Sequence, residues 1–331
     1  MTIGRTLSGQ TLDEQEETYN VSLRPKHLAE CLGQETVKEK LSIAITAARQ
    51  RREPLEHMLF YGPPGLGKTT LASVVATEMG ATLRCSSGPA LAKAGDVMGL
   101  LTNIGTGDVL FIDEIHRLST VVEEFLYPAM EDFKVDFTVD SGLHAKTINF
   151  PLKRFTLIGA TTRVGLLSAP LRSRFGILYH LEYYSTDELM EILHRTAGLL
   201  RLEYQEGTLE QIAGRSRGTP RIANRLLKRV RDYAQVKGTG VLSKDIVEKG
   251  LKMEQIDPLG LDELDRSFLR ALIQVYEGGP AGIEAIAATL GEERDTLEDV
   301  VEPYLLQIGF VRRTKRGREV TPQARAHVGP A

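Results

Sequence analysis

Residues 58–75 read MLFYGPPGLGKTTLASVV, in which an apolar run leads into a glycine-rich turn and then into a helical pattern. A G-x-x-x-x-G-K-T sequence between a strand and a helix is typical of a phosphate-binding P-loop. Its glycines let backbone N–H groups point inward toward anionic oxygens, and the helix N-terminus adds partial positive charge. Lys68 can reach the β and γ phosphates, and the Thr69 hydroxyl can hold Mg²⁺. The predicted nucleoside triphosphate ligands in this loop are Gly65, Gly67, Lys68, Thr69 and Thr70.

The composition describes an ordinary globular chain. Its 331 residues favour two or three domains, because single cores rarely grow much beyond about 250 residues. There is no apolar run of about 18 residues, and the polar start has no signal-peptide core, so we expect a cytoplasmic protein. Cys31 and Cys85 fit no metal-ligand spacing and are read as two reduced thiols rather than a disulfide or zinc site. The net charge of −3 argues against a surface coated in basic residues, so DNA contact would need local patches.

The pattern along the chain predicts three domains. Residues 1–184 alternate short apolar runs with helical stretches, which is typical of an α/β nucleotide-binding core with a parallel sheet. The first 20 residues are polar and acidic and are expected to form a flexible arm. A capping-box sequence at Ser185 opens a small helical domain over residues 185–255. Residues 256–331 give three helices and a basic turn between strand-like pieces, which predicts a winged helix.

A hairpin interrupts the predicted core. Val135, Phe137 and Val139 alternate up to a turn at residues 140–142, and Ile148 and Phe150 alternate on the return. The residues alone leave two interpretations open, a plain surface hairpin and an element that grips a partner.

Two carboxylates follow the apolar run 109–112. Asp113 and Glu114 would lie at the carboxyl end of a buried strand, the edge that faces the ligand crevice in open α/β sheets. Asp113 can hold Mg²⁺, and Glu114 can orient the water that attacks the γ phosphate. Such a pair is a weak signal alone and a strong one beside a P-loop.

Further along, a third strand ends in Thr161-Thr162, where hydroxyls could sense a γ phosphate or the attacking water. Simple strand termination is the alternative. Arg172 and Arg174 follow, and arginines suit the planar charge of a transferring phosphate. All of these residues are candidates for the hydrolytic site.

A helix start at residues 218–221 reads Gly-Thr-Pro-Arg, with Thr219 a candidate N-cap and Pro220 suited to the first turn. Arg221 could swing from there toward a nucleotide. The arginines at every fourth position from Arg217 form a basic stripe, which we expect to be a solvated or salt-bridged face apart from Arg221.

Together these motifs resemble the AAA+ ATPases. The stretches 62–70, 110–118, 159–163 and 218–225 are more narrowly similar to the RuvB family, the Holliday junction branch migration motors, and the resemblance covers nearly the whole chain. It implies an ATP hydrolase and DNA helicase that drives branch migration in homologous recombination and DNA repair.

The resemblance also implies an assembly. It predicts a homohexameric ring on double-stranded DNA, with ATP and Mg²⁺ at each subunit junction, together with RuvA at the Holliday junction and the RuvC resolvase. It assigns Arg174 as a finger that enters the neighbouring site, with Arg172 as a second candidate contact. Thr162 becomes the first sensor of nucleotide and Arg221 the second.

Some residues are implicated by the resemblance alone. Leu23 and Arg24 would border the base, and Tyr184 would line the site at the domain junction. Three consecutive residues would lie near the nucleotide: Glu131, Asp132 and Phe133. The hairpin over residues 135–150 corresponds to the element through which this family engages RuvA, which favours a functional role for it.

The last domain carries its positive charge beyond the third helix. That helix, residues 293–307, is mostly acidic, so we expect phosphates to repel it from a major groove. Basic side chains instead surround Gly317, where they suit sequence-independent phosphate contact. The resemblance assigns DNA contact to Arg313 and Arg318, with Arg294 a weaker candidate.

Two other function classes share the ATPase motifs. A clamp-loader-like switch would bind and hydrolyse ATP without translocation, but it would be expected to end in an all-helical collar. A protein-remodelling unfoldase would need an aromatic pore loop, which is not evident. The predicted winged helix with its basic wing favours the DNA motor.

Overall fold

The computed structural model describes residues 23–139 and 146–329. The chain divides into two compact units, one of residues 24–182 and the other of residues 183–329 with Leu23. The predicted N-terminal arm and the turn of the hairpin at residues 140–142 lie outside the described residues. No helix in the described ranges is long and apolar enough to cross a membrane.

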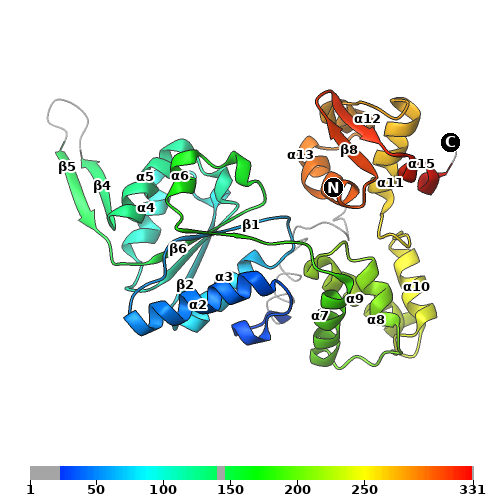
Figure 1. Cartoon of the computed structure of the whole chain (residues 1–331), viewed down its shortest axis with the longest axis horizontal. Helices are drawn as coiled ribbons and strands as arrows, with labels where there is room; N and C mark the ends of the chain where they lie inside the picture. The colour runs from blue at the N-terminus through cyan, green and yellow to red at the C-terminus, as the bar shows by residue number, and fades with distance from the viewer. Residues whose placement is uncertain (1–22, 140–145, 330–331) are drawn as a thin grey trace. The chain divides into compact units, whose positions relative to one another are not determined.

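A five-stranded parallel sheet forms the centre of the first unit, which confirms the α/β class (Figure 1). Its strand order is β2-β3-β6-β1-β7. The strands are β2 (Leu83–Ser87), β3 (Val109–Asp113), β6 (Thr156–Thr161), β1 (Met58–Tyr61) and β7 (Ile177–His180). The three central strands are almost wholly buried, because helices cover both faces of the sheet. This is why their sequences read as continuous apolar runs.

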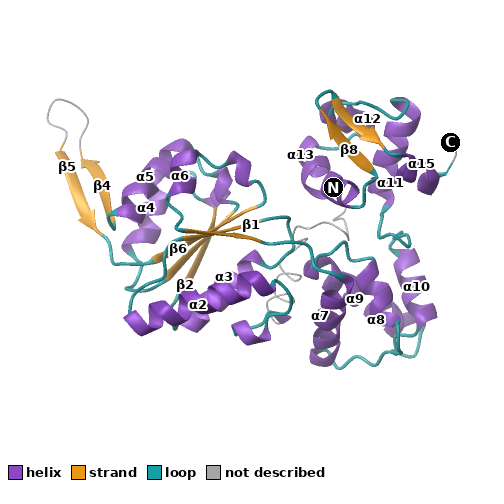
Figure 2. Cartoon of the chain, viewed as in Figure 1, coloured by secondary structure: helices purple, strands orange, loops and turns teal. Residues whose placement is uncertain are grey.

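Helices flank this sheet on its two faces (Figure 2). One layer contains α2 (Glu35–Arg51) and α3 (Lys68–Met79). The other contains α4 (Ala94–Thr102), α5 (Thr120–Glu131) and α6 (Ala169–Ser173). Short 3₁₀ turns connect several elements: η1 (Leu28–Glu30), η2 (Gly88–Ala90), η3 (Ile115–Arg117) and η4 (Val164–Leu166). All five parallel strands end at one edge, where the P-loop emerges.

The predicted hairpin is present and stands apart from the parallel sheet (Figure 1). Strand β4 (Lys134–Val139) pairs antiparallel with β5 (Lys146–Pro151), with Val135 opposite Phe150. Val135 is fully buried against the core, whereas Phe150 is 42% exposed. The base of the hairpin is therefore anchored to the core through Val135, while Phe150 opposite it is exposed.

Four helices form the small domain of the second unit. They are α7 (Thr186–Leu199), α8 (Thr208–Gly214), α9 (Pro220–Lys237) and α10 (Lys244–Met253). The predicted capping box is confirmed, since the Ser185 hydroxyl accepts from the Glu188 N–H and the Glu188 carboxylate accepts from the Ser185 N–H. Apolar residues from all four helices share one core.

The last part of the chain is a winged helix. Its elements are α11 (Glu263–Arg270) continued by a π-helical turn η5 (Ala271–Val275), α12 (Ile283–Leu290), the three consecutive segments α13 (Arg294–Thr296), η6 (Leu297–Val301) and α14 (Glu302–Gln307), the wing strands β8 (Val311–Thr314) and β9 (Gly317–Val320), and α15 (Pro322–Val328). Gly317 has φ 141°, and a Cβ there would lie 2.4 Å from the Ala281 carbonyl oxygen. Only glycine fits at this position of the wing turn, because the Ala281 backbone lies directly against it.

Candidate functional site

The P-loop connects β1 to α3, and its backbone requires glycine. Gly62 has φ 141°, and a Cβ there would lie 2.4 Å from the Leu181 carbonyl oxygen; Gly65 and Gly67 also have positive φ. Lys68 begins α3 and is 7% exposed, and its Nζ donates to the carbonyl oxygens of Gly62 and Pro63, both at 2.8 Å. The amine is therefore held inside the loop, where a phosphate would meet it.

The two predicted carboxylates lie at the same edge of the sheet as the P-loop. Asp113 ends β3, and its carboxylate accepts from the Glu114 N–H at 2.9 Å. Glu114 adopts φ 46°, a left-handed conformation that turns the chain sharply at the end of the strand. The two neighbouring carboxylates consequently leave the strand end in different directions.

Glu114 is held by two polar side chains. Its Oε2 accepts from the Thr162 hydroxyl at 3.3 Å and lies 3.2 Å from Nδ1 of His116. Burial and the neighbouring charge of Asp113 raise the pKa of Glu114, although Lys68 and Thr162 oppose the shift. A carboxylate with these properties suits the orientation of a water molecule and the acceptance of its proton.

His116 is a site residue that the motif analysis did not single out. Its Nδ1 lies 2.9 Å from the Thr161 hydroxyl, and the ring tautomer decides which of the two donates. Thr161 is fully buried and also accepts from the Arg163 N–H. The prediction that both threonine hydroxyls face the crevice is therefore wrong for Thr161, which supports His116, whereas Thr162 contacts Glu114. The sequence signal that could have identified His116 is the presence of a histidine two positions after Glu114.

Arg174 lies at the opposite edge of the sheet from the P-loop of its own chain. It follows α6, two residues before Gly176, whose N–H donates to the carbonyl oxygen of His57 just ahead of β1. Strand β1 has four residues, about 13 Å at 3.3 Å each, and the P-loop begins at its far end. The guanidinium pairs with Glu131 at 3.1 Å and stacks over Tyr127 at 4.3 Å.

The segment from Glu131 to Phe133 lies at that same far edge. The Met130 carbonyl oxygen is 3.0 Å from Nε2 of His57, and the Phe133 ring packs near His57 and Phe155. These positions cannot approach a nucleotide in the P-loop of the same chain. The prediction that they lie near the nucleotide therefore concerns the nucleotide of a neighbouring chain.

Leu23 and Arg24, which the resemblance also implicated, are neighbours in the chain but belong to different units. Leu23 is 6% exposed, and its carbonyl oxygen accepts from Arg195 of α7 at 2.7 Å. Arg24, in the first unit, lies near Cys85, where its charge opposes the burial that raises the pKa of the thiol.

The start of α9 differs from its predicted chemistry in two ways. Thr219 occupies the N-cap position but makes no side-chain cap; its hydroxyl donates to the Ser216 carbonyl oxygen at 3.3 Å. The predicted basic stripe is not a solvated face, because Arg217 and Arg225 are each 4% exposed. Arg217 is salt-bridged to Asp265, as the alternative allowed, and precedes the helix in a left-handed conformation. Pro220 does open the helix, and Arg221 lies half-buried on its first turn.

Tyr184 connects the start of α7 to this turn. Its N–H donates to the Gly218 carbonyl oxygen at 2.9 Å, and its side chain packs against the core of the small domain. It therefore lies within reach of the loop that precedes Arg221.

The predicted DNA-contacting arginines of the wing are engaged with carboxylates. Arg318 is 16% exposed and pairs with Glu302 at 2.8 Å and Glu298 at 3.2 Å. Arg313 makes a bidentate contact with the same Glu302, which is fully buried. Burial alone would raise the pKa of Glu302, but its hydrogen bonds to the two arginines lower it. Arg318 consequently braces the wing from inside.

The exposed positive charges lie at the tip of the wing. Lys315 and Arg316 are exposed, and neither makes an ion pair within the described residues. Arg312 is 68% exposed and lies 3.8 Å from Glu319, and Arg294 pairs with Glu284 and Glu298. The tip is thus the most accessible basic part of the wing.

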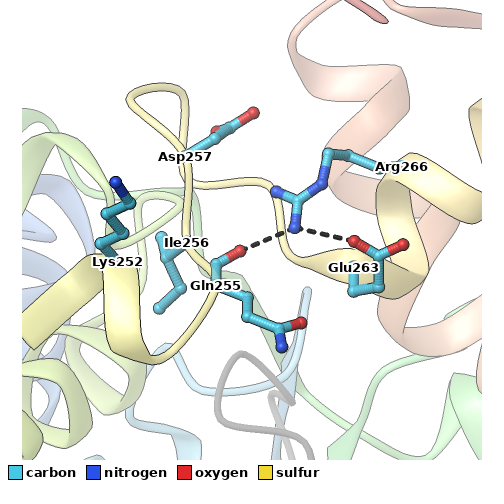
Figure 3. A pocket seen from close by; sticks show the side chains of 6 residues that line it. All are labelled: Lys252, Gln255, Ile256, Asp257, Glu263 and Arg266. Carbon is cyan, nitrogen blue, oxygen red and sulfur yellow. Dashed lines mark hydrogen bonds and ion pairs between the residues drawn. The ribbon is translucent and has the colours of Figure 1, made fainter.

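An open hollow of about 580 Å³ lies where the small domain joins the winged helix, lined by Lys252, Gln255, Ile256, Asp257, Glu263 and Arg266 (Figure 3). It contains none of the predicted nucleotide-binding residues. Among the described residues no three His, Cys, Asp or Glu side chains cluster as a metal site.

Three family models match successive parts of the chain. They describe a Holliday junction DNA helicase RuvB P-loop domain at residues 23–181, a RuvB AAA lid domain at 184–257 and a RuvB C-terminal winged helix domain at 258–329. The final domain is therefore not the helical collar expected of a clamp loader.

Solved structures of similar sequence come from Thermotoga maritima. The Thermotoga maritima RuvB Holliday junction branch migration motor is 53% identical, with TM-score 0.85, over 92% of this chain and 98% of that chain. A single-residue variant of that protein is 52% identical, with TM-score 0.86, over 93% of this chain and 98% of its own. A second variant is likewise 52% identical, with TM-score 0.86, over 92% and 98%.

Proposed function

Because the chain belongs to the RuvB family of Holliday junction DNA helicases, we propose that it is an ATP-driven motor that moves Holliday junctions along double-stranded DNA. One observation carries this proposal: a single chain combines a P-loop and paired carboxylates at one sheet edge with a winged helix that carries an exposed basic tip. The first part supplies hydrolysis, and the second supplies sequence-independent contact with DNA.

The P-loop edge holds the nucleotide and performs the chemistry. Gly65, Gly67, Lys68 and Thr70 bind the phosphates. Thr69 lies on the first turn of α3, and Asp113 ends β3 at that edge. Their hydroxyl and carboxylate oxygens suit Mg²⁺, which would take its remaining ligands from phosphates and water. Bound Mg²⁺ would neutralise charge on the transferring phosphate. Glu114 orients the attacking water, with Thr162 and His116 holding its carboxylate.

Arg174 acts on the nucleotide of a neighbouring subunit. Its position at the far edge of the sheet supports a ring in which that edge faces the P-loop of the next chain. Glu131, Asp132 and Phe133 share this edge and would border the same shared nucleotide. We therefore propose a homohexamer, with Arg172 as a secondary contact.

Residues near the small domain complete the nucleotide site. Arg221 reports on the phosphates from the first turn of α9, while Leu23, Arg24 and Tyr184 border the base. The proposed domain boundaries are residues 1–184, 185–255 and 256–331. We further propose a cytoplasmic location, recruitment by RuvA through the β4–β5 hairpin, and cooperation with RuvC.

Contact with DNA centres on the wing. Arg313 retains 56% exposure beside Glu302, so it can approach phosphate while held in place. Arg318 and Arg294 contribute mainly by shaping the surface, and Lys315 and Arg316 supply accessible charge.

A junction assay tests the proposal. Purified protein is mixed with a synthetic four-way DNA junction, RuvA and ATP–Mg²⁺, and the conversion of the junction to duplex products is followed. We expect conversion by the native chain, and none by Lys68→Ala or Glu114→Gln. ATP hydrolysis by the native chain without junction movement, in the presence of RuvA, would contradict the motor function.

A further inference from the structure

Arg217 is a buried arginine from the small domain whose hydrogen bonds go to the winged helix. Its Nε donates to the Gly260 carbonyl oxygen at 2.9 Å, and its Nη2 donates to the carboxylate of Asp265. The guanidinium stacks over the Tyr304 ring at 4.8 Å. The Arg217 side chain is 3% exposed and that of Asp265 is 0% exposed, so water does not screen this pair.

The chain between the two domains is held at several points around this arginine. Asp257 accepts from the N–H groups of Leu259 and Leu261, and the Tyr304 hydroxyl donates to the Leu259 carbonyl oxygen. Arg266 donates to the Gln255 carbonyl oxygen and to Glu263 (Figure 3). The segment predicted as a simple break is thus an ordered junction.

The backbones of the two domains also meet directly at this junction. Gly260 has φ 74°, and a Cβ there would lie 2.8 Å from the Arg215 carbonyl oxygen. The backbone of Gly260 therefore packs directly against that of Arg215, with no side chain between them.

A buried ion pair of this kind specifies geometry more than it adds stability. Its Coulomb attraction is offset by the desolvation of both charges, so an apolar contact of the same size could be equally stable. An apolar contact, however, tolerates sliding, whereas the planar guanidinium must meet a carboxylate, a carbonyl oxygen and a ring in fixed directions. Arg217 therefore selects one placement of the winged helix on the small domain.

The position of Arg217 in the chain links this junction to the nucleotide sensor. Gly218 follows it and accepts a hydrogen bond from Tyr184, Thr219 is the N-cap of α9, and Arg221 lies on the first turn. A shift of Arg221 with the state of the nucleotide would be carried through one short, buried turn to Arg217.

We propose that Arg217 is a positioning residue that transmits the movement of the small domain to the DNA-contacting wing. The proposal rests on the proposed motor function and deepens it. The pair of Arg217 and Asp265 makes the small domain and the winged helix move as one body. Each hydrolysis then displaces DNA rather than bending the connection between these two domains.

The principal test is the ratio of ATP hydrolysed to junctions moved. Arg217→Met keeps the bulk of the side chain and removes its charge. Arg215→Met is the matched control, because Arg215 is also a buried arginine, 8% exposed, but pairs with Glu248 inside the small domain. We expect Arg217→Met to hydrolyse ATP while consuming about tenfold more ATP per junction moved, within the range of known coupling energies. Arg215→Met should keep the native ratio.

A second variant separates positioning from folding. Arg217→Met leaves the Asp265 charge buried without its arginine, whereas Arg217→Met with Asp265→Asn removes both charges. We expect the double variant to recover the native melting temperature and remain poorly coupled. The proposal would be overturned if the double variant recovered both the native melting temperature and the native ratio of ATP hydrolysed to DNA junctions moved. A native ratio in Arg217→Met itself would also overturn it.

A structural readout tests the same link without ATP or DNA. Spin labels replace the exposed Val236 of the small domain and Val275 of the winged helix, in a chain with Cys31→Ser and Cys85→Ser. We expect one narrow distance distribution in the otherwise native chain and loss of that narrow distribution in the double variant. If the double variant gives the same distance distribution as the otherwise native chain, the proposal is overturned. This outcome does not depend on whether the native chain moves DNA junctions, which tests the motor function separately.

Discussion

At the scale of single residues, Glu114 shows how local geometry prepares a side chain for chemistry. Its left-handed backbone turns it away from Asp113, and Thr162 and His116 hold its carboxylate in place. Burial and the adjacent charge raise its pKa, so the ionised form is a stronger proton acceptor than an ordinary glutamate. The two carboxylates are thus suited to different tasks, metal binding and water activation.

Glu114→Gln should bind nucleotide normally and slow its hydrolysis by about 10²- to 10⁴-fold, because the amide cannot accept the proton of water. Single-turnover hydrolysis and the binding of a fluorescent ATP analogue measure the two steps. Glu124→Gln, at an exposed position of α5, is the control and should behave as the native chain. Equal loss of binding and hydrolysis would contradict the assigned role.

At the scale of elements, the wing depends on a carboxylate from the helix beneath it. Glu302 is fully buried and receives both Arg313 of β8 and Arg318 of β9. The two strands therefore hold their angle to α14 through one charged group. The exposed tip at Lys315 and Arg316 is presented from this rigid base.

Alanine at the tip and alanine inside the wing should have different effects. Lys315→Ala with Arg316→Ala should lower the slope of log affinity against log salt by about 2, because two phosphate contacts are lost, with an unchanged melting temperature. Arg318→Ala should instead lower the stability by about 1–3 kcal/mol, since the buried Glu302 loses one of its two arginine partners. DNA titrations at several salt concentrations and calorimetry distinguish the two effects. A tip variant with the native salt slope would show that DNA binds elsewhere.

The wing should also be sensitive to acid. The pKa of Glu302 is lowered in the folded state, so its stabilisation is fully present above the unfolded value of about 4.3 and is lost as the pH falls through the lower folded value. Thermal unfolding measured between about pH 3 and pH 6 should therefore show a fall in stability that Glu302→Gln largely removes. An equal fall in the variant would assign the acid sensitivity to other groups.

At the scale of the whole molecule, the two halves of the proposed catalytic site lie on opposite edges of one sheet. Lys68 and Glu114 occupy the carboxyl edge, and Arg174 with Glu131 occupies the other. One chain therefore cannot complete its own site. In a ring, the repeated head-to-tail contact would bring the two edges together.

Two inactive variants should restore one another when mixed. Lys68→Ala disables the P-loop and Arg174→Ala disables the finger, yet about a quarter of the contacts in random mixed rings would pair an intact P-loop with an intact finger. Mixing should thus recover a matching share of the native ATPase rate, measured by phosphate release. If mixed rings form and stay inactive, Arg174 does not act on a neighbour.

The sequence by itself determined the class of fold and the chemistry of the P-loop edge. Buried parallel strands must be continuously apolar, and the loop needs glycines and a lysine at fixed spacing, so both leave local signals at Lys68, Asp113 and Glu114. Resemblance supplied the residues from Glu131 to Phe133, which have no such signal, and it assigned Arg174, already a candidate from the sequence, to the site of a neighbour.

Only the tertiary structure decided which charged side chains are exposed and which are paired with a carboxylate inside the fold. Arg217 and Arg318 read as surface arginines, but each is paired with a carboxylate inside the fold. Arg217 is buried against Asp265, 48 residues later in the chain, and the partly buried Arg318 pairs with Glu302, 16 residues earlier. Likewise, Glu131 and Arg174 lie at the edge away from the P-loop, because the chain at the ends of α5 and α6 bonds to His57, just ahead of β1. Spacing along a chain cannot reveal such partners, because desolvation and pairing depend on what the fold brings together.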